Sequence, residues 1–236
     1  MINDFRKKNI VVLTGAGISA ESGLKTFRDN DGLWEGHRVE EVATPEAYYQ
    51  NPELVQDFYN QRRRQLLSNQ VSPNAAHQAL ARFELEHDSD FSLVTQNVDN
   101  LHQHAGSKKI YPMHGELLKA RCTGCEEITE NKKDLSSKTS CAVCGSVGQM
   151  RPHIVWFGEM PLYMMEIENQ ISRCDIFISI GTSSVVYPAA GFSQMAKSYG
   201  AECIELNLEP SATATVFDYG EYGPATEVVP SFFNYA

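Results

Sequence analysis

The chain has 236 residues, of which 42% are apolar and 21% charged, and it carries a formal net charge of −10. This is the composition of a globular protein with one large domain or slightly more. The acidic balance argues against a general nucleic-acid surface, and no apolar run approaches the roughly 20 residues that cross a bilayer.

The cysteines and the N-terminal residues indicate the cellular compartment of the protein. The N-terminal residues contain no apolar stretch of the signal-peptide kind, and the six cysteines suit a reducing compartment. Cys174 and Cys203 lie in apolar sequence and are expected to be inert core thiols. We therefore expect a cytoplasmic protein with neither nucleic acid nor a membrane as partner.

Short apolar runs alternate with amphipathic stretches along the chain. Buried strands are predicted at residues 10–13, 91–95, 110–113, 175–180 and 203–207. Helices are predicted near residues 52–67, 74–86, 164–173 and 189–199. The alternation favours an α/β fold, in which a mostly parallel sheet is covered on both faces by helices.

Two stretches do not fit this alternation, at about residues 35–71 and 119–151. We interpret them as insertions that together form a smaller lobe. The large lobe would then consist of about residues 1–34, 72–118 and 152–236.

The first predicted strand runs into a glycine-rich turn that contains Gly15-Ala16-Gly17. A strand, a Gly-x-Gly turn and a helix start bring backbone amides close to a pyrophosphate, so this turn is a candidate dinucleotide site. A tight strand-to-helix turn without a ligand is the other interpretation. No acidic residue about twenty positions further on clearly ends a second strand, so the ordinary dehydrogenase pattern is incomplete.

Polar side chains crowd at the end of the predicted strand 91–95, where Gln96, Asn97 and Asp99 follow it. The carboxyl ends of parallel strands form the ligand crevice in such sheets, although these side chains could serve only to cap a turn. His114 follows the next short strand and precedes the second insertion. A single histidine is more often structural, but at a junction of two lobes it could act as a general base near neutral pH.

Two cysteine pairs, Cys122 with Cys125 and Cys141 with Cys144, are separated by fifteen residues. This spacing can place four thiolates around one tetrahedral zinc, and four protein ligands indicate a structural metal. The polar segment between the pairs has little apolar surface to bury and would need the metal to order it. Two disulfides or four free thiols are the alternatives.

Seven motifs occur together, in the order in which sirtuins carry them. They are Gly15–Gly23, Thr26–Arg28, Gln96–Asp99, His114-Gly115, the four cysteines, Gly181–Ser183 and Asn207–Glu209. From about residue 9 onward the chain resembles a sirtuin, an NAD-dependent protein-lysine deacylase. The resemblance implies a Rossmann-like large lobe with a parallel sheet, and an inserted small lobe with a helical module and a zinc site made by the four cysteines. NAD would lie in the cleft, and the acyl-lysine would enter from the opposite side.

The resemblance also assigns residues to the cofactor. The pyrophosphate and the nicotinamide ribose would be held by Gly15, Ala16, Gly17, Ser19, Ala20, Glu21, Gly23 and the 23–34 loop with Thr26, Phe27, Arg28 and Trp34. The nicotinamide end would meet Gln96, Asn97, Val98 and Asp99. The adenosine half would lie along Gly181, Thr182, Ser183, Asn207, Leu208 and Glu209, and Ala225 is also assigned to the cofactor.

In the reaction that the resemblance implies, NAD is consumed and no hydride is transferred. The acyl oxygen attacks the anomeric carbon of the ribose as nicotinamide leaves, and His114 would take a proton from a ribose hydroxyl, with Asn97 and Asp99 as its catalytic partners. The products would be free lysine, nicotinamide and an O-acyl-ADP-ribose. The substrate backbone would pair as a strand with Val155, Trp156 and Phe157.

The chain departs from the common sirtuin pattern at Lys25-Thr26, where many members have Pro-Asp, and at Glu116, where many have Ser or Thr. Both features resemble the class III branch, which removes acidic acyl groups. That branch also carries Tyr-x-x-Arg in a small-lobe helix, and Tyr59 and Arg62 match it on one helix face. The resemblance therefore implies removal of succinyl, malonyl and acetyl groups.

Other interpretations stay open. The run Arg62–Arg64 could be a solvated basic face, and Arg63 and Arg64 should matter little if they face solvent. A protein ADP-ribosyltransferase could use the same NAD site. A non-catalytic zinc-ribbon adaptor that senses NAD is a third function, although intact His114, Asn97 and Asp99 argue against it.

Overall fold

A computed structural model describes residues 5, 7–24, 33–34 and 36–235. Its main sheet has six strands in the order β11-β10-β9-β1-β4-β5, and all neighbours are parallel. The strands are β1 (Ile10–Thr14), β4 (Phe91–Thr95), β5 (Ile110–Pro112), β9 (Ile176–Ile180), β10 (Glu202–Asn207) and β11 (Tyr219–Tyr222). The predicted parallel α/β sheet is thus confirmed, and β11 is added at its edge.

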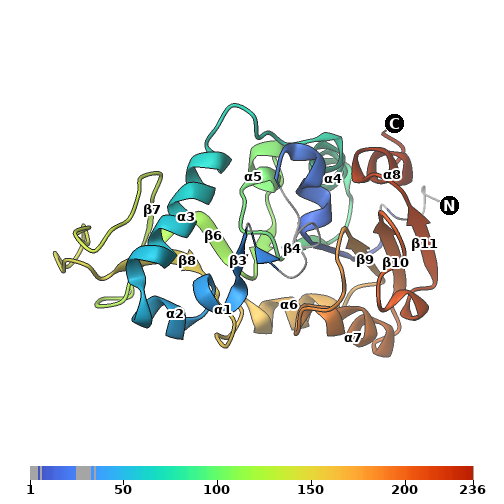
Figure 1. The fold of residues 1–236 in the computed structure, drawn as a ribbon. Helices are drawn as coiled ribbons and strands as arrows, with labels where there is room; N and C mark the ends of the chain where they lie inside the picture. The colour runs from blue at the N-terminus through green and yellow to red at the C-terminus, as the bar shows by residue number, and fades with distance from the viewer. Residues whose placement is uncertain (1–4, 6, 25–32, 35, 236) are drawn as a thin grey trace.

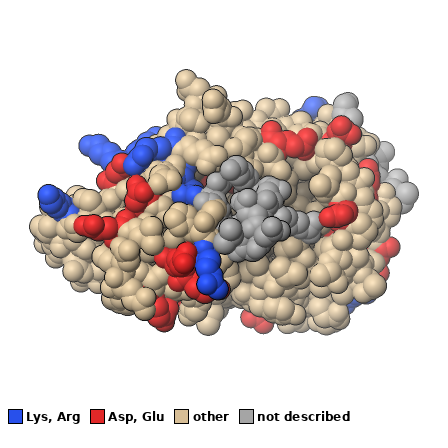
Figure 2. Space-filling view, viewed as in Figure 1, with Lys and Arg blue, Asp and Glu red and all other residues tan. Residues whose placement is uncertain are grey.

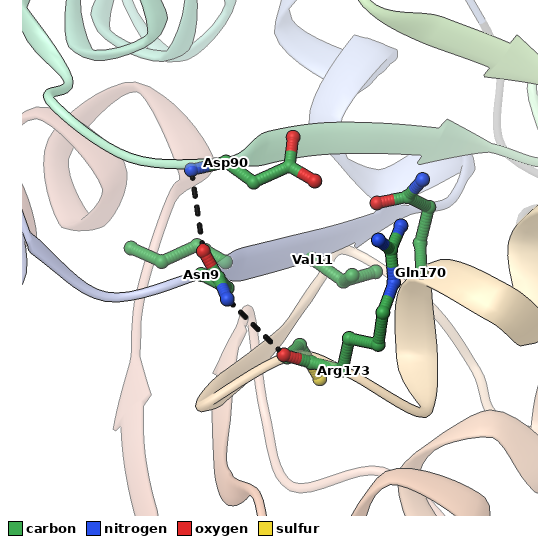
Figure 3. Close-up of a pocket in the computed structure, with 7 residues that line it drawn as sticks. Asn9, Val11, Asp90, Gln170 and Arg173 are labelled. Atoms are coloured by element: carbon green, nitrogen blue, oxygen red, sulfur yellow. Dashed lines mark hydrogen bonds between the residues drawn. The ribbon is translucent and has the colours of Figure 1, made fainter.

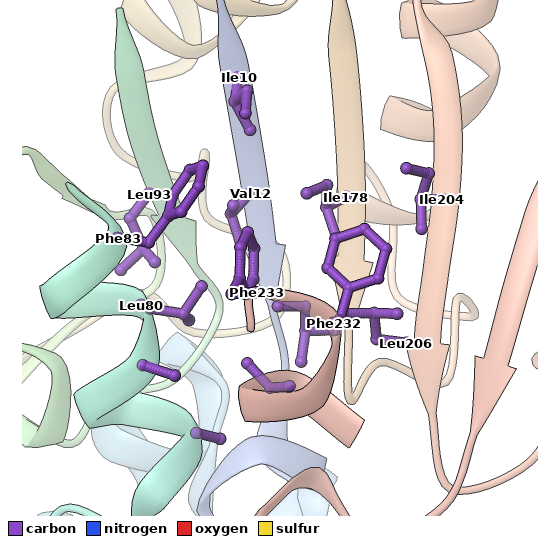
Figure 4. Close-up of a cluster of buried hydrophobic side chains, with 14 of the residues drawn as sticks. Ile10, Val12, Leu80, Phe83, Leu93, Ile178, Ile204, Leu206, Phe232 and Phe233 are labelled. Carbon is purple, nitrogen blue, oxygen red and sulfur yellow. The ribbon is translucent and has the colours of Figure 1, made fainter. Parts of the chain in front are cut away.

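Both faces of this sheet are buried because successive side chains of each strand point to opposite sides. Ile10 and Val12 of β1 pack in one apolar cluster, whereas Val11 and Leu13 pack in another. The first cluster lies under α4 (Ala75–Glu86) and α8 (Ala225–Phe232), as Figure 4 shows. The second lies over α6 (Met164–Ile171) and α7 (Phe192–Ser198), so the sheet is the middle layer of three (Figure 1).

Short elements complete this part of the molecule. They are the 3-10 helix η2 (Ala16–Ser22), α5 (Leu101–Ala105), and the 3-10 turns η4 (Ala189–Gly191) and η5 (Ala214–Val216). The helix predicted near 189–199 is therefore η4 followed by α7. None of the helices in the described ranges combines the length and the apolar character needed to cross a bilayer.

The other end of the molecule carries helices and a second sheet. Its helices are α1 (Val39–Val42), α2 (Pro45–Gln50) and α3 (Pro52–Leu66), after a hairpin of β2 (Leu33–Trp34) and β3 (His37–Arg38). The second sheet is antiparallel, in the order β7-β6-β8, with β6 (Gly115–Cys122), β7 (Ile128–Glu130) and β8 (Met150–Ile154). An apolar cluster that includes Phe58, Leu117 and Trp156 joins the helices to this sheet.

The capping residues explain where two of these helices begin. Thr44 precedes α2 and its hydroxyl accepts from the Ala47 amide at 3.1 Å, while Asn51 precedes α3 and accepts from the Leu54 amide at 3.1 Å. Each cap is followed by a proline, which fits the first helical turn.

The second sheet crosses the boundaries proposed for the lobes. β6 begins at residue 115 in the predicted large lobe and continues into the small one, and β8 begins at residue 150 in the small lobe and ends at residue 154 in the large one. The two-lobe boundaries of the sequence analysis stay a prediction.

Candidate active site

A cavity of about 720 Å³ lies at the carboxyl ends of β1, β4, β9 and β10. Its walls are the loops that follow these strands, together with side chains of α3 and the segment after β8. The crevice outside the carboxyl ends of the strands is where open parallel sheets bind ligands. Its size is within the range of roughly 300–1,000 Å³ found for small-molecule sites.

A second cavity, of about 210 Å³, lies at the opposite ends of the strands, beside α6 (Figure 3). Asn9, Asp90, Gln170 and Arg173 line it, with Ile10, Val11 and Cys174. No site residue predicted from the sequence is among them. The larger cavity is therefore the candidate site.

Most of the predicted residues meet in the larger cavity. Its lining includes Gly15, Ala16, Gly17, Ser19, Ala20, Glu21, Tyr59, Arg62, Gln96, Asn97, Val98, Asp99, His114, Val155, Trp156, Phe157, Gly181, Thr182, Ser183, Asn207, Leu208 and Ala225. Gly23 and Glu209 do not line it; Gly23 ends η2 with a φ of 86°, and Glu209 is exposed. Thr26, Phe27, Arg28 and the Trp34 side chain lie outside the described residues.

The two glycines of the first turn allow close contact between neighbouring loops. The Gly15 amide donates to the Ile180 carbonyl at 3.0 Å, and the Gly17 amide donates to the Gly181 carbonyl at 2.8 Å. A Cβ at either glycine would come within 2.8 Å of Gly181. These two amides are thus engaged within the protein, and the glycines bring the loops after β1 and β9 together.

A buried polar network joins the loops after β1 and β4. The Asn97 amide nitrogen donates to the Gly15 carbonyl at 3.1 Å and to the Ser19 hydroxyl at 3.2 Å. The Ser19 hydroxyl in turn donates to Asp99 at 3.0 Å. Burial raises the pKa of Asp99, while bonds from the Leu101 amide and from Ser19 favour its charged form. The network fixes the orientation of both the amide and the carboxyl group at the cavity wall.

His114 has a fixed tautomer. Its Nδ1 lies 3.0 Å from the Gln96 carbonyl oxygen, which can only accept, so Nδ1 carries the proton in the neutral ring. The Nε2 lone pair is then available for another proton. Burial lowers the pKa of His114, against a smaller opposing effect of the Gln96 bond, so the ring is neutral at pH 7. This is the protonation state that a general base needs.

Two buried histidines behind this network were not found from the sequence. His77 Nε2 lies 3.5 Å from the Ser19 hydroxyl, and His102 Nε2 lies 3.0 Å from the Thr14 hydroxyl. Burial lowers the pKa of His77 to about 4 and that of His102 well below its usual value. Both rings are therefore neutral supports of the site. His77 lies within an ordinary helical pattern, and His102 lies in the short helix α5, which the sequence analysis did not predict.

Tyr59 and Arg62 lie one turn apart on α3, at the cavity wall. The Tyr59 hydroxyl accepts from the Trp156 indole at 3.0 Å, and burial raises the pKa of Tyr59, so the phenol stays protonated. The Arg62 guanidinium carbon lies 3.6 Å from the centre of the Phe58 ring, and Nη1 donates to the Phe58 carbonyl at 2.7 Å. The two side chains thus bring a neutral donor and a cation to one wall.

The idea of a solvated basic face is wrong for Arg63. Its side chain is 1% exposed, and it donates to the Leu117 carbonyl at 3.1 Å and to Asn60 at 2.8 Å. Burial lowers its pKa to about 10. Arg64 does face solvent, where it pairs with Asp134 at 2.8 Å. Successive helical residues point about 100° apart, so three adjacent arginines meet three environments.

The four cysteines converge beside the second sheet, where Cys122 ends β6 and the other three lie in the connecting segments. Their Sγ atoms all lie within 4.8 Å of one another, with Cys122 and Cys144 3.7 Å apart and Cys125 and Cys141 3.8 Å apart. These distances are far longer than a disulfide bond of about 2.05 Å. Four thiol groups in one small volume fit a structural zinc site. Cys174 and Cys203 are separate buried thiols, and burial raises their pKa to about 12 and about 11.

Comparisons with known proteins agree with this geometry. Residues 15–188 match the Sir2 family. A Vibrio vulnificus (strain YJ016) protein named NAD-dependent protein deacylase is 57% identical, over 96% of this chain and 93% of the relative. A structure described as a Sir2 homolog–NAD complex is similar with a TM-score of 0.88 and 38% identity, covering 99% of this chain and 91% of the other. A Sir2–p53 peptide–NAD+ structure has a TM-score of 0.81 and 30% identity, covering 95% and 92%.

Proposed function

Because the chain belongs to the Sir2 family, we propose that it removes succinyl and malonyl groups, as well as acetyl groups, from protein lysine side chains. The coarser activity is that of an NAD-dependent protein deacylase, the name carried by a relative that is similar over almost the whole length. The choice of acidic acyl groups is the finer part of the proposal, and it rests on the side chains of α3.

The residues at the carboxyl ends of the strands suit NAD, because a fixed amide, a carboxyl group and several small residues line one cavity. Gly15, Ala16 and Ser19 would hold one half of the cofactor, with Asn97 and Asp99 at its nicotinamide end. When bound, NAD supplies an electrophilic ribose carbon and the nicotinamide leaving group. His114 holds its Nε2 lone pair ready to accept a hydroxyl proton at the same cavity.

The peptide would pair with the segment after β8. The amides of Val155 and Phe157 already donate to the His114 and Ala43 carbonyls, each at 2.9 Å. These two amides are therefore already engaged, so a peptide strand added here would bond to other backbone groups of the segment.

The observation that carries the acyl choice is the shared position of Tyr59 and Arg62 in the cavity that His114 lines. A succinyl-lysine brings a carboxylate into this cavity, and burying that anion without a partner costs several kcal/mol. Arg62 offers a charge-assisted bond and Tyr59 a hydroxyl donor. An acetyl group has no carboxylate to meet them.

The test is mass spectrometry of acetyl-, malonyl- and succinyl-lysine peptides of one sequence, incubated with enzyme and NAD. We expect all three to be deacylated. In the variant Arg62→Met, desuccinylation should lose roughly 2–4 kcal/mol of transition-state binding, while deacetylation should change much less. Arg64→Met is the matched control, since Arg64 is exposed on the same helix.

Three results would contradict the proposal. Equal loss of both activities in Arg62→Met would make Arg62 structural. A wild-type enzyme that leaves succinyl-lysine intact would remove the acid preference. ADP-ribose attached to protein, without deacylated lysine, would identify a transferase instead.

A further inference from the structure

Trp156 belongs to the segment expected to pair with the peptide backbone, yet its side chain is 2% exposed and directed toward α3. It stacks against the Tyr48 ring, with 5.2 Å between centroids. The Arg151 guanidinium carbon lies 3.4 Å from the centre of the indole ring. The indole is therefore packed by Tyr48 and by Arg151.

The Glu159 carboxylate holds Arg151 and Trp156 in this arrangement. Glu159 accepts from both terminal nitrogens of Arg151, at 2.7 and 2.9 Å, and from the Trp156 amide at 2.8 Å. Arg151 also donates to the Ile154 carbonyl at 2.8 Å. Arg151 is buried, so the fork-like pair with Glu159 holds both the backbone and the ring of Trp156 in one geometry.

The indole N–H then fixes the hydroxyl of Tyr59, at 3.0 Å. Indole nitrogen is a donor only, so the Tyr59 oxygen must be the acceptor. The hydrogen of the Tyr59 hydroxyl therefore has to be donated elsewhere, and accepting a bond makes a hydroxyl a stronger donor. Tyr59 and Trp156 both line the cavity.

We propose that Trp156 is a positioning residue for the acyl group: its indole N–H holds the Tyr59 hydroxyl as a donor toward an acidic acyl carboxylate. The Arg151–Glu159 pair keeps the indole in place. This inference rests on the proposed acyl choice and adds a residue that acts through Tyr59. The Trp156 indole would set the ratio of the activities on acidic and neutral acyl groups through Tyr59, without itself bonding to the acyl group.

The test compares kcat/KM for succinyl- and acetyl-lysine peptides in Trp156→Phe, Tyr59→Phe and the double variant. Phenylalanine keeps an aromatic ring for Arg151 but removes the N–H. We expect Trp156→Phe to lower kcat/KM for the succinyl peptide about tenfold, mostly by raising KM, and kcat/KM for the acetyl peptide by less than about twofold. The double variant should be no worse than Tyr59→Phe, because Trp156 acts through the Tyr59 hydroxyl.

Tyr48→Phe is the matched control, since its ring contacts the same indole while its hydroxyl lies against the Met150 carbonyl. It should leave the ratio of the two activities unchanged. Equal losses on both peptides in Trp156→Phe, or additive losses in the double variant, would overturn the positioning role.

Arg62→Met, assayed in parallel, separates the two possible failures. If Arg62→Met lowers both activities equally, the proposed acyl choice fails. If Arg62→Met is selective and Trp156→Phe is not, only the role of Trp156 fails.

An NMR measurement of the indole N–H tests the same contact without any substitution of Trp156, so its result does not depend on whether Trp156→Phe folds. The chain has two tryptophans, so its ¹⁵N-indole spectrum holds two signals, assigned with Trp34→Phe. The Trp156 signal should shift in Tyr59→Phe, and on adding succinyl-lysine peptide more than acetyl-lysine peptide. A Trp156 signal that is unchanged by Tyr59→Phe would overturn the inference.

Discussion

His114 shows how one hydrogen bond and burial together set the tautomer and the protonation state of a side chain. The Gln96 carbonyl selects the tautomer, and burial favours the neutral ring. The position of this histidine at a strand end could be predicted from the sequence. Its tautomer could not, because the partner carbonyl lies 18 residues away and reaches it only through the packing of β4 against β5.

We expect the activity to depend on pH through His114. Because the pKa of His114 is lowered from 6.5, the base form persists on acidification. The value of kcat/KM should therefore stay level from about pH 8 to below pH 6.5 and then fall about tenfold per pH unit. His114→Ala should lose roughly 10²-fold or more in turnover, while the exposed His104→Ala should keep both rate and profile. An acidic limb centred above pH 6.5, or near-normal turnover in His114→Ala, would contradict this role.

At the scale of elements, α3 shows what a sequence pattern can and cannot specify. Its start was predictable, because Asn51 and Pro52 form a recognisable cap. The burial and the bonding partners of Arg62, Arg63 and Arg64 were not predictable, because they depend on which neighbouring element each side chain contacts. The partner of Arg63 is a carbonyl of β6, 54 residues further along the chain.

Arg63→Met should destabilise the fold, whereas Arg64→Met should not. Loss of Arg63 leaves the Leu117 carbonyl without this donor, at a cost of about 1–3 kcal/mol, and relief of the buried charge offsets part of it. The Asn60 oxygen loses one of two donors and still accepts from the Leu135 amide at 2.9 Å. We expect a net loss of roughly 1–3 kcal/mol in unfolding free energy. For the exposed Arg64–Asp134 pair, the change should stay within about 1 kcal/mol. Urea unfolding of both variants measures the difference, and equal midpoints would refute it.

At the scale of the whole molecule, two strands connect the cysteine cluster to the cavity. β6 begins next to His114 and ends at Cys122, while β8 leads into the Val155–Phe157 segment. The motif spacing predicted the cysteine cluster, but it could not show that the same two strands link the cluster to the cavity.

The charged side chains are unevenly distributed on the face of the molecule seen in Figure 1. On this face, Figure 2 shows Lys and Arg side chains gathered toward the end that carries α3 and β7, with acidic side chains spread across the face.

Removing the metal should therefore reduce activity without altering any residue of the cavity. Elemental analysis should find one zinc per chain, and Cys141→Ala or a strong chelator should lower both Tm and deacylation. Cys174→Ala, which changes a buried thiol outside the cluster, should keep the zinc. Active protein that contains no zinc would show that the four thiols do not need a metal.

The place of β1 in the middle of the main sheet affects how the chain can fold during its synthesis. Ile10 is opposite Phe91 on one side and Ile176 on the other, so the second neighbour is made 166 residues later. At a translation rate of about 5–20 residues per second, this strand waits roughly 8–33 seconds for that partner. Until then one edge of a strongly apolar strand is exposed, and unpaired edges of this kind promote aggregation. This strand order therefore makes the half-built sheet the stage at which the nascent chain is most exposed to aggregation.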